Sequence, residues 1–453
     1  MLRWSPFISP LRNPIRSLGL VFIIWKTLLL LIALVSPGAG YDTSTAILLS
    51  SSQHHQSPVD RLVQNLVRWD AFYYVKVAER DYLWEQEWAF SWGLTRVIGA
   101  IARTLGGHQP PSIQTVALVG ICVAHISHFL AVLALYDLTR HVTRSHESDR
   151  LAFVTATLHI FSPAGLFLSS PYSEPVFALL NITGNLCYVL SMRSAPGQGL
   201  SPHETDVWIL AAGLCFGAAC TVRGNGLLSG LTLAYHTIMI LRDAVTQGLT
   251  PSHVRRMTSG ILAGFLTGMG AVIPQFIAYR HYCQTRHEGV LRPWCTKLLP
   301  SIYSWVQQYY WNNGFLRYWK LSNVPLFIIA APVMYLLLQW DLRPYLRNRR
   351  SPNTRMSTTQ RAESLVMKKC LICLMIPQVT LALLALTNFH IQIITRLASG
   401  YPLWYMAVAM WLISSPNVVE KKRPSVSASL VVRFMVVYAM VQGALFANFL
   451  PPA

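Results

Sequence analysis

Long apolar runs recur along the whole chain, and each is bounded by a polar or basic stretch. A helical run of about 20 residues matches the hydrocarbon thickness of a bilayer. The chain is 53% hydrophobic and 12% charged, with mean hydropathy +0.38, which is too much uninterrupted apolar surface for a soluble core. Because the runs are long rather than short and alternating, they predict helices and not barrel strands. The sequence therefore predicts an all-α polytopic membrane protein.

About eleven such runs can be traced, with edges uncertain by several residues. They lie at roughly 17–36, 114–136, 151–170, 175–192, 207–222, 226–241, 258–278, 324–340, 368–387, 401–414 and 430–449. Four of them are short or interrupted, so re-entrant segments stay open as an alternative at 175–192, 207–222, 226–241 and 401–414. We expect a single membrane domain over residues 1–453.

The distribution of basic residues predicts the orientation, because short loops rich in Lys and Arg stay in the cytosol. With the N-terminus in the cytosol and the runs alternating, the basic loop 341–367 is cytosolic. The two longest loops, 37–113 and 279–323, then lie on the other side of the membrane. The net charge of +19 is spread between apolar runs, which favours lipid phosphates over nucleic acid as its counterpart.

The 37–113 loop contains an acid among aromatic residues, Asp70 preceded by Trp69 and followed by Phe72 and Tyr73. A carboxylate just outside a membrane helix is placed where a general base can meet a substrate whose lipid tail stays in the bilayer. Further along, apolar residues at about 90–105 recur at helical spacing and predict an amphipathic helix among the headgroups. A helix packed on the bundle is the structural alternative.

Further polar groups are expected at the same membrane face, where an ionisable side chain is costly unless it pairs or functions. Between apolar runs lie Tyr172 and Glu174, Arg223 and Asn225, and His390, Gln392 and Arg396. The 279–323 loop adds Trp294, Gln308, Trp311, Asn312 and Arg317. Aromatic and amide side chains of this kind serve as interfacial anchors or bind sugars, and the residues alone leave both interpretations open.

Two cysteines, Cys283 and Cys295, lie twelve positions apart in the 279–323 loop. In an oxidising compartment they could form a disulfide, an outcome that the sequence leaves at even odds. No Cys/His cluster has zinc spacing, and no P-loop or dinucleotide-binding motif is present.

In combination, these segments resemble the GPI mannosyltransferase 2 family. The resemblance rests on Trp69-Asp70 with Tyr73, Tyr74 and Glu79, on Glu87-Trp88-Ala89-Phe90, Ser162-Pro163-Ala164, Tyr172-Ser173-Glu174 and Val222-Arg223-Gly224-Asn225-Gly226, on Pro293-Trp294-Cys295 and residues 303–319, on 324–332, and on 390–396. These blocks follow one another from about residue 68 to 400, and no single block would suffice. Gly224 stands where the family pattern has Ser, but no charged group is lost.

The resemblance implies a GT-C-type glycosyltransferase of the endoplasmic reticulum membrane with its active site in the lumen. Its donor would be dolichyl-phosphate mannose. Its acceptor would be a GPI precursor, whose first mannose would receive a second in α1,6 linkage. Because a β-linked donor gives an α-linked product, the step would invert and need one base. No cofactor is implied, and a small membrane partner subunit stays open.

The same resemblance suggests a role for each candidate residue. Asp70 would be the base, with Glu79 and Glu87 as second-line acids that orient it or the acceptor. Arg223 and Arg396 would hold the donor phosphate, because a guanidinium group fits phosphate oxygens and keeps its charge near lipid. Sugar or acceptor contacts would come from Trp69, Tyr172, Glu174, Asn225, Trp294, Gln308, Trp311, Asn312, Arg317, His390 and Gln392, and no metal is expected.

Three other functions stay open at this point. Another polyprenyl-phosphate-dependent glycosyltransferase, such as a protein O-mannosyltransferase, would show a similar external acid and similar basic residues. A lipid or solute transporter would carry ionisable groups at mid-span and an internal repeat. Apart from Lys368 and Lys369 at the start of one run, only Lys26 and Arg433 among the Lys, Arg, Asp and Glu residues fall within the apolar runs. A non-catalytic membrane subunit would not need Asp70.

Overall fold

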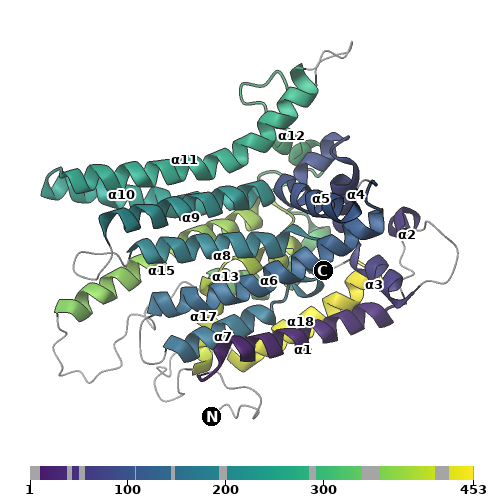
Figure 1. Cartoon of the computed structure of the whole chain (residues 1–453), viewed down its shortest axis with the longest axis horizontal. Helices are drawn as coiled ribbons and strands as arrows, with labels where there is room; N and C mark the ends of the chain where they lie inside the picture. The colour runs from purple at the N-terminus through teal and green to yellow at the C-terminus, as the bar shows by residue number, and fades with distance from the viewer. Residues whose placement is uncertain are drawn as a thin grey trace.

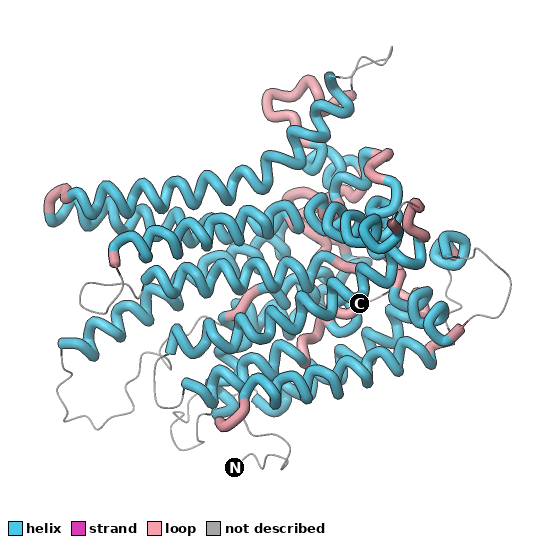
Figure 2. The backbone as a smooth tube through the Cα atoms, in the orientation of Figure 1, coloured by secondary structure: helices cyan, strands magenta, loops and turns pink. Residues whose placement is uncertain are grey.

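The structure is a computed structural model that describes residues 11–37, 43–49, 57–107, 109–143, 148–192, 201–284, 292–338, 358–413 and 428–451. Within these ranges it contains helices and loops and no strand. Figures 1 and 2 show the long helices side by side in one bundle, with several short helices gathered at one end. The all-α polytopic membrane fold predicted from the apolar runs is confirmed.

Eight helical segments in the described ranges are long and apolar enough to cross a membrane. They contain α1 (Pro14–Val35), α6 (Ile113–Thr143), α8 (Ser173–Met192), α9 (Pro202–Val222), α11 (Pro251–Tyr279), α13 (Val324–Leu338), α15 (Thr358–Asn388) and α18 (Ala428–Ala447). The other three predicted runs fall on α7 (Ser148–Ile160), α10 (Gly230–Gln247) and α17 (Leu403–Ile413), which are shorter or less apolar.

The predicted run 151–170 is divided into two pieces by its own sequence. Helix α7 ends at Ile160, and a 3-10 turn follows at Gly165–Leu168. Pro163 lacks a backbone N–H and cannot continue the helical ladder. Gly165 has φ +50°, a conformation that a residue with a side chain rarely adopts. The break redirects the chain toward the start of α8.

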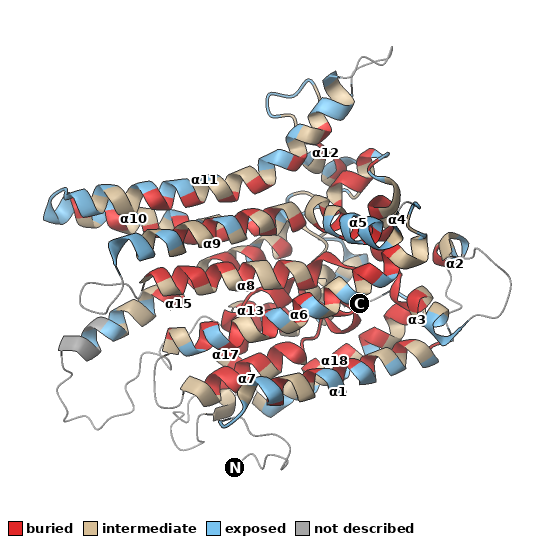
Figure 3. Cartoon of the chain, in the orientation of Figure 1, coloured by how far each residue is buried: buried red, intermediate tan, exposed pale blue. Residues whose placement is uncertain are grey.

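Helix α8 lies at the centre of the bundle and α11 at its edge, as the burial colours of Figure 3 indicate. In the apolar stretch of α8 that is long enough to cross a membrane, 61% of the residues are buried, whereas in the corresponding stretch of α11 the share is 22%. The exposed face of α11 carries Ile261, Phe265 and Phe276. Large apolar side chains exposed along a helix that can span a bilayer fit contact with lipid.

Successive helices run in alternating directions, so their termini collect at two ends of the bundle. We call one the Asp70 end: α6 and α8 begin there, and α18 ends there with Phe449 against Trp69. At the opposite end α8 finishes at Met192 and α11 begins at Pro251. The two ends therefore correspond to the two faces of the membrane.

The 37–113 segment folds into short helices at the Asp70 end. They are α2 (Ser44–Leu49), α3 (Pro58–Leu66), α4 (Ala71–Arg80), a 3-10 turn at Glu85–Ala89, and α5 (Trp92–Gly106). Helix α5 covers most of the 90–105 segment. Its residues Leu94 and Ile98 are buried against the bundle, whereas Val97, Ile101 and Leu105 are exposed. One apolar face therefore packs on protein, and a second remains at the surface.

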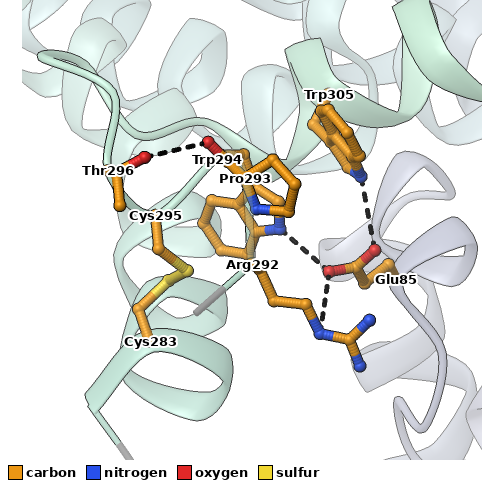
Figure 4. Close-up of a disulfide and its surroundings, with 8 residues drawn as sticks. All are labelled: Glu85, Cys283, Arg292, Pro293, Trp294, Cys295, Thr296 and Trp305. Carbon is orange, nitrogen blue, oxygen red and sulfur yellow. Dashed lines mark hydrogen bonds and ion pairs between the residues drawn. A yellow bond between two sulfur atoms is a disulfide. The ribbon is translucent and has the colours of Figure 1, made fainter. Parts of the chain in front are cut away.

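The second long segment also lies at the Asp70 end. A single π-helical turn, Arg280–Gln284, extends α11, and α12 (Ile302–Tyr309) follows. Cys283 and Cys295 form a disulfide, with their Cα atoms 5.7 Å apart (Figure 4). Of the basic segment expected at 341–367, residues 341–357 lie outside the described ranges, and the rest forms the first turns of α15.

Candidate functional site

The turn that carries Asp70 has an unusual backbone. Trp69 has φ +53°, in the left-handed region that non-glycine residues rarely occupy. Such a conformation costs on the order of 1–3 kcal/mol and persists only where surrounding contacts hold it. The Trp69 ring packs on Phe449, with 5.0 Å between ring centroids, and α4 begins immediately after Asp70. The turn therefore projects Asp70 from the N-terminus of a helix.

Tyr172, which precedes α8, fixes this turn from both sides. Its hydroxyl accepts a hydrogen bond from the backbone N–H of Asp70 at 3.0 Å and donates one to the carbonyl oxygen of Arg68 at 3.1 Å. The Tyr172 side chain is fully buried, with an exposed fraction of 1%. It was expected to contact sugar or acceptor, but in this structure it positions the backbone of the acidic turn.

Asp70 belongs to a continuous group of four charged side chains, which we call the charge network: Asp70, Glu174, Arg223 and Arg396. Arg396 Nη2 lies 2.8 Å from Asp70 Oδ2, and Arg396 Nε lies 3.3 Å from Glu174 Oε1. Arg223 Nη1 lies 2.7 Å from the same oxygen of Glu174. The chain thus brings together residues from four separate segments, and their formal charges sum to zero.

The members of the charge network differ in how far solvent reaches them. The side chain of Glu174 is 1% exposed and those of Arg223 and Arg396 are 16% and 15% exposed, whereas that of Asp70 is 33% exposed. Burial lowers the pKa of Arg396, but the carboxylates of Asp70 and Glu174 raise it by more, so the net shift is upward. Arg396 therefore stays charged. Of the two carboxylates in the charge network, Asp70 is the more accessible to solvent.

Neutral side chains hold the two arginines in place. Arg223 donates to the hydroxyl oxygen of Ser173 at 2.7 Å, and that hydroxyl also contacts Tyr74 Oη at 2.9 Å. The guanidinium of Arg396 lies over the ring of Phe167, 5.1 Å from its centroid. Asn225 contacts the hydroxyl of Tyr401 at 3.1 Å. These contacts fix the orientation of both guanidinium groups before any ligand arrives.

The two second-line acids form pairs of their own. Glu79 pairs with Lys76 one turn earlier on α4, at 2.7 Å. Glu87 is buried, pairs with Arg80, and accepts hydrogen bonds from the backbone N–H groups of Leu83 and Trp84. Among the described residues neither carboxylate bonds to the charge network. Both therefore stabilise the 37–113 segment in this structure.

Burial and nearby negative charge act on one tyrosine beside Asp70. The pKa of Tyr73 is raised by burial and by the carboxylates of Asp70 and Glu87. The Tyr73 ring stacks on Phe90, with 4.4 Å between centroids. Tyr73 therefore stays protonated near Asp70 at neutral pH.

Trp294 lies in a separate buried cluster around Glu85, shown in Figure 4. Its indole N–H donates to Glu85 Oε1 at 2.9 Å, and Trp305 donates to Glu85 Oε2 at 3.3 Å. Arg292 lies 3.6 Å from the same carboxylate. Since Trp294 is 0% exposed, its ring presents no face to a sugar in this structure.

The remaining candidates of the second segment divide into two groups. His390 contacts the Trp311 carbonyl oxygen at 3.2 Å and stacks on Tyr318, whose hydroxyl donates to Gln392 at 2.8 Å. Burial lowers the pKa of His390, so this imidazole is neutral at pH 7. Gln308, Asn312 and Arg317 are exposed, and Arg317 donates to Asn312 at 3.3 Å. The second group is open to a ligand from solvent.

Sequence reasoning missed several residues that shape this end of the bundle. Ser173 stood in a quoted motif, but its hydroxyl gave no sign that it joins Tyr74 to Arg223. Glu85 was overlooked, although it lies only two positions from Glu87. Its role depends on two tryptophans more than 200 positions away, a relation that no local pattern reveals.

Comparisons with known proteins agree with the resemblance seen in the sequence. The family described as Mannosyltransferase (PIG-V) matches residues 15–453. The GPI mannosyltransferase 2 of Aspergillus oryzae is 39% identical, with 97% of this chain and 96% of the relative covered. The protein of the same name from Gibberella zeae is 39% identical, with coverage of 97% and 98%, and that from Yarrowia lipolytica is 33% identical, with coverage of 96% and 99%.

Among solved structures, the apo oligosaccharyltransferase of Archaeoglobus fulgidus is similar at 13% identity and a TM-score of 0.47. The alignment covers 96% of this chain and 56% of that one. The family match extends over almost the whole chain, and the relatives are matched over almost their whole length. The chain is therefore a multi-pass membrane protein that belongs to the Mannosyltransferase (PIG-V) family.

Proposed function

We propose that this protein transfers mannose from dolichyl-phosphate mannose to the first mannose of a GPI precursor, in α1,6 linkage and with inversion. The names of the relatives support a mannosyltransferase of GPI-anchor biosynthesis. The observation that carries the proposal is the charge network, in which an accessible carboxylate stands beside two fixed guanidinium groups at one end of a membrane bundle. An inverting transfer from a lipid phosphate needs a base for the acceptor hydroxyl and positive charge beside the leaving phosphate.

In the proposed step, the 6-hydroxyl of the acceptor mannose loses its proton to Asp70. The hydroxyl oxygen then forms a bond to the anomeric carbon of the donor from the face opposite the phosphate. The bond between that carbon and the phosphate oxygen breaks, and dolichyl phosphate leaves with the electron pair. Arg396 and Arg223 stabilise the negative charge that develops on the leaving phosphate.

The contacts of Arg396 suggest how the donor would activate the base. Without substrate, Asp70 Oδ2 is held 2.8 Å from Arg396 Nη2, so this carboxylate oxygen is already engaged. Arg396 Nε is buried and has no well-aligned hydrogen-bond acceptor among the described residues. A donor phosphate that binds Arg396 would compete with Asp70 for this guanidinium. Asp70 would then be freer to take a proton once the donor is bound.

The proposed location follows from the same chemistry. Both substrates carry lipid tails, so the reacting groups must meet at a membrane face, and the Asp70 end of the bundle supplies one. We propose that this end faces the lumen of the endoplasmic reticulum, with α1 starting in the cytosol. The basic residues expected on the cytosolic side favour this orientation.

Analysis of lipid-linked glycans in cells that lack this protein tests the proposal. We expect a GPI precursor with one mannose to accumulate, because the next transfer is missing, and the wild-type chain should remove it. Accumulation of a different lipid-linked glycan would instead support another polyprenyl-phosphate-dependent transferase. Normal GPI precursors in such cells would refute the proposed function.

A further inference from the structure

A hollow lies at the end of the bundle opposite Asp70, between α8, α10, α11 and α15. It is a partly open hollow lined by side chains from all four helices. Its polar wall includes His253, Arg256 and Lys369, and its apolar wall includes Met192, Met239 and Ile240. The function proposed above makes no use of any of these residues.

This basic pocket is far from the charge network. Glu174 stands in the first turn of α8, whereas Tyr188 and Met192, which line the pocket, stand in its last turns. Fourteen to eighteen residues of helix separate them, which corresponds to roughly 21–27 Å at 1.5 Å per residue. A ligand in the basic pocket would therefore occupy the other face of the membrane from the proposed reaction.

The cations of the pocket are not neutralised within the described part of the chain. Arg255 pairs with Asp206 at 3.4 Å, but its neighbour Arg256 and Lys369 have no ion pair among the described residues. Arg256 Nε and His253 Nδ1 are also buried without a hydrogen-bond partner there. The acid of the lining, Asp243, is already in contact with Arg242 at 3.2 Å. Buried donors without acceptors mark a place where a ligand can supply them.

The chemistry of the two walls identifies a class of ligand. Arginine and lysine together favour a phosphate group, which accepts several charge-assisted hydrogen bonds. The methionines and isoleucine suit the glycerol and first acyl carbons behind such a group. Helix α10 also exposes Ile238 and Leu241 beside this region, as a lipid-facing helix does. Basic pockets between membrane helices are known to hold phosphorylated headgroups.

We propose that this pocket binds a phosphate ester, presented as the headgroup of an anionic phospholipid on the membrane face opposite Asp70. The proposal does not depend on the reaction at Asp70. A bound headgroup would join α10, α11 and α15 at their ends. It would therefore stabilise the bundle against unfolding in proportion to the occupancy of the pocket.

The test uses the full-length protein purified in neutral detergent and the shift of its melting temperature. The probes are mixed micelles with dioleoylphosphatidic acid, matched micelles with dioleoylphosphatidylcholine, and soluble glycerol 3-phosphate. The pocket variant is Arg256→Gln with Lys369→Gln. The control, Arg361→Gln with Lys368→Gln, removes the same charge from exposed positions of α15. Lys369→Gln alone and native mass spectrometry serve if the double variant does not fold.

We expect phosphatidic acid to raise the melting temperature of the wild type and the control, and phosphatidylcholine to have a much smaller effect. In the pocket variant the apparent affinity should fall on the order of tenfold for each cation removed. A shift with glycerol 3-phosphate alone would support the phosphate site but assign it to a soluble ester. Equal responses of the pocket variant and the control, or no response to either phosphate, would overturn the proposal.

Discussion

At the scale of single residues, the geometry of the Asp70 turn depends on one hydroxyl. Tyr172→Phe keeps the buried ring but removes both hydrogen bonds to the turn. We expect a loss of stability of about 1–3 kcal/mol, since the backbone N–H of Asp70 loses its acceptor. The rate should fall with little change in the KM for the donor, because Asp70 is misplaced while the arginines are not. A transfer assay over a range of donor concentrations measures both, and an unchanged rate would contradict this role.

Glu174 is the residue whose loss should most affect folding. It is 1% exposed and is the shared partner of two partly buried arginines. Glu174→Gln leaves Arg223 without its carboxylate partner and Arg396 with Asp70 alone, at a cost of about 3–5 kcal/mol. Thermal unfolding in detergent should show a clear decrease in melting temperature. The control is Glu79→Gln, which removes a partly exposed pair worth about 0–1 kcal/mol. Similar stability of the two variants would refute the structural importance of Glu174.

The two arginines should act through the donor. Arg396→Ala and Arg223→Ala are expected to raise the KM for dolichyl-phosphate mannose, because each removes a cation that would contact its phosphate. Excess donor should restore part of the activity if phosphate binding is their role. A loss of rate that no donor concentration relieves would show that the arginines serve only the fold. Microsomes with each variant provide the measurement.

Some of this site could be predicted from the sequence, and some could not. Asp70, Arg223 and Arg396 stood in polar motifs at the ends of apolar runs, and the structure brings them together. No feature of the sequence indicated that both arginines would pair with Glu174. Nor did the sequence show that Trp294 would be fully buried on Glu85, because aromatic residues in a loop look the same whether they face a sugar or the core.

At the scale of elements, the second segment is joined to the first by Glu85 and closed by a disulfide (Figure 4). A loop of this length typically gains about 2–4 kcal/mol from its disulfide. Cys283→Ala with Cys295→Ala should therefore lower the melting temperature, whereas Cys122→Ala, at an exposed free cysteine, should not. Resistance of the Cys283 and Cys295 thiols to alkylation before reduction checks the bond itself. Free thiols in the native protein would contradict it.

Helix boundaries show where sequence periodicity stops being sufficient. The long apolar runs were located correctly, because bilayer thickness fixes their length. The division of the run 151–170 followed from Pro163 and from the left-handed Gly165, of which only the proline gave a warning in the sequence. Lys26 illustrates the same limit. Its ammonium donates to the Leu168 carbonyl and the Ser169 hydroxyl, both at 2.8 Å, and so supplies hydrogen bonds at the end of the 3-10 turn that follows the break.

At the scale of the whole molecule, the alternation of helices predicts which segments share a membrane face. Glycosylation sequons engineered at exposed positions near Gln109 and Leu298 should be modified, because both segments lie at the Asp70 end. A sequon at the exposed turn near Leu249, between α10 and α11, should not be modified. Gel mobility before and after glycosidase treatment reports each outcome. Modification at Leu249 would invert the proposed orientation.

The central claim is that Asp70 is the base of a mannosyl transfer, and one comparison tests it most directly. Mannose transfer from dolichyl-phosphate mannose to a one-mannose GPI precursor is measured in microsomes that contain wild type or Asp70→Asn at equal protein levels. Asparagine keeps the shape but cannot accept the proton, so we predict a rate lower by about 10²–10⁴-fold with donor KM unchanged or reduced. Near-normal transfer by Asp70→Asn would contradict the account.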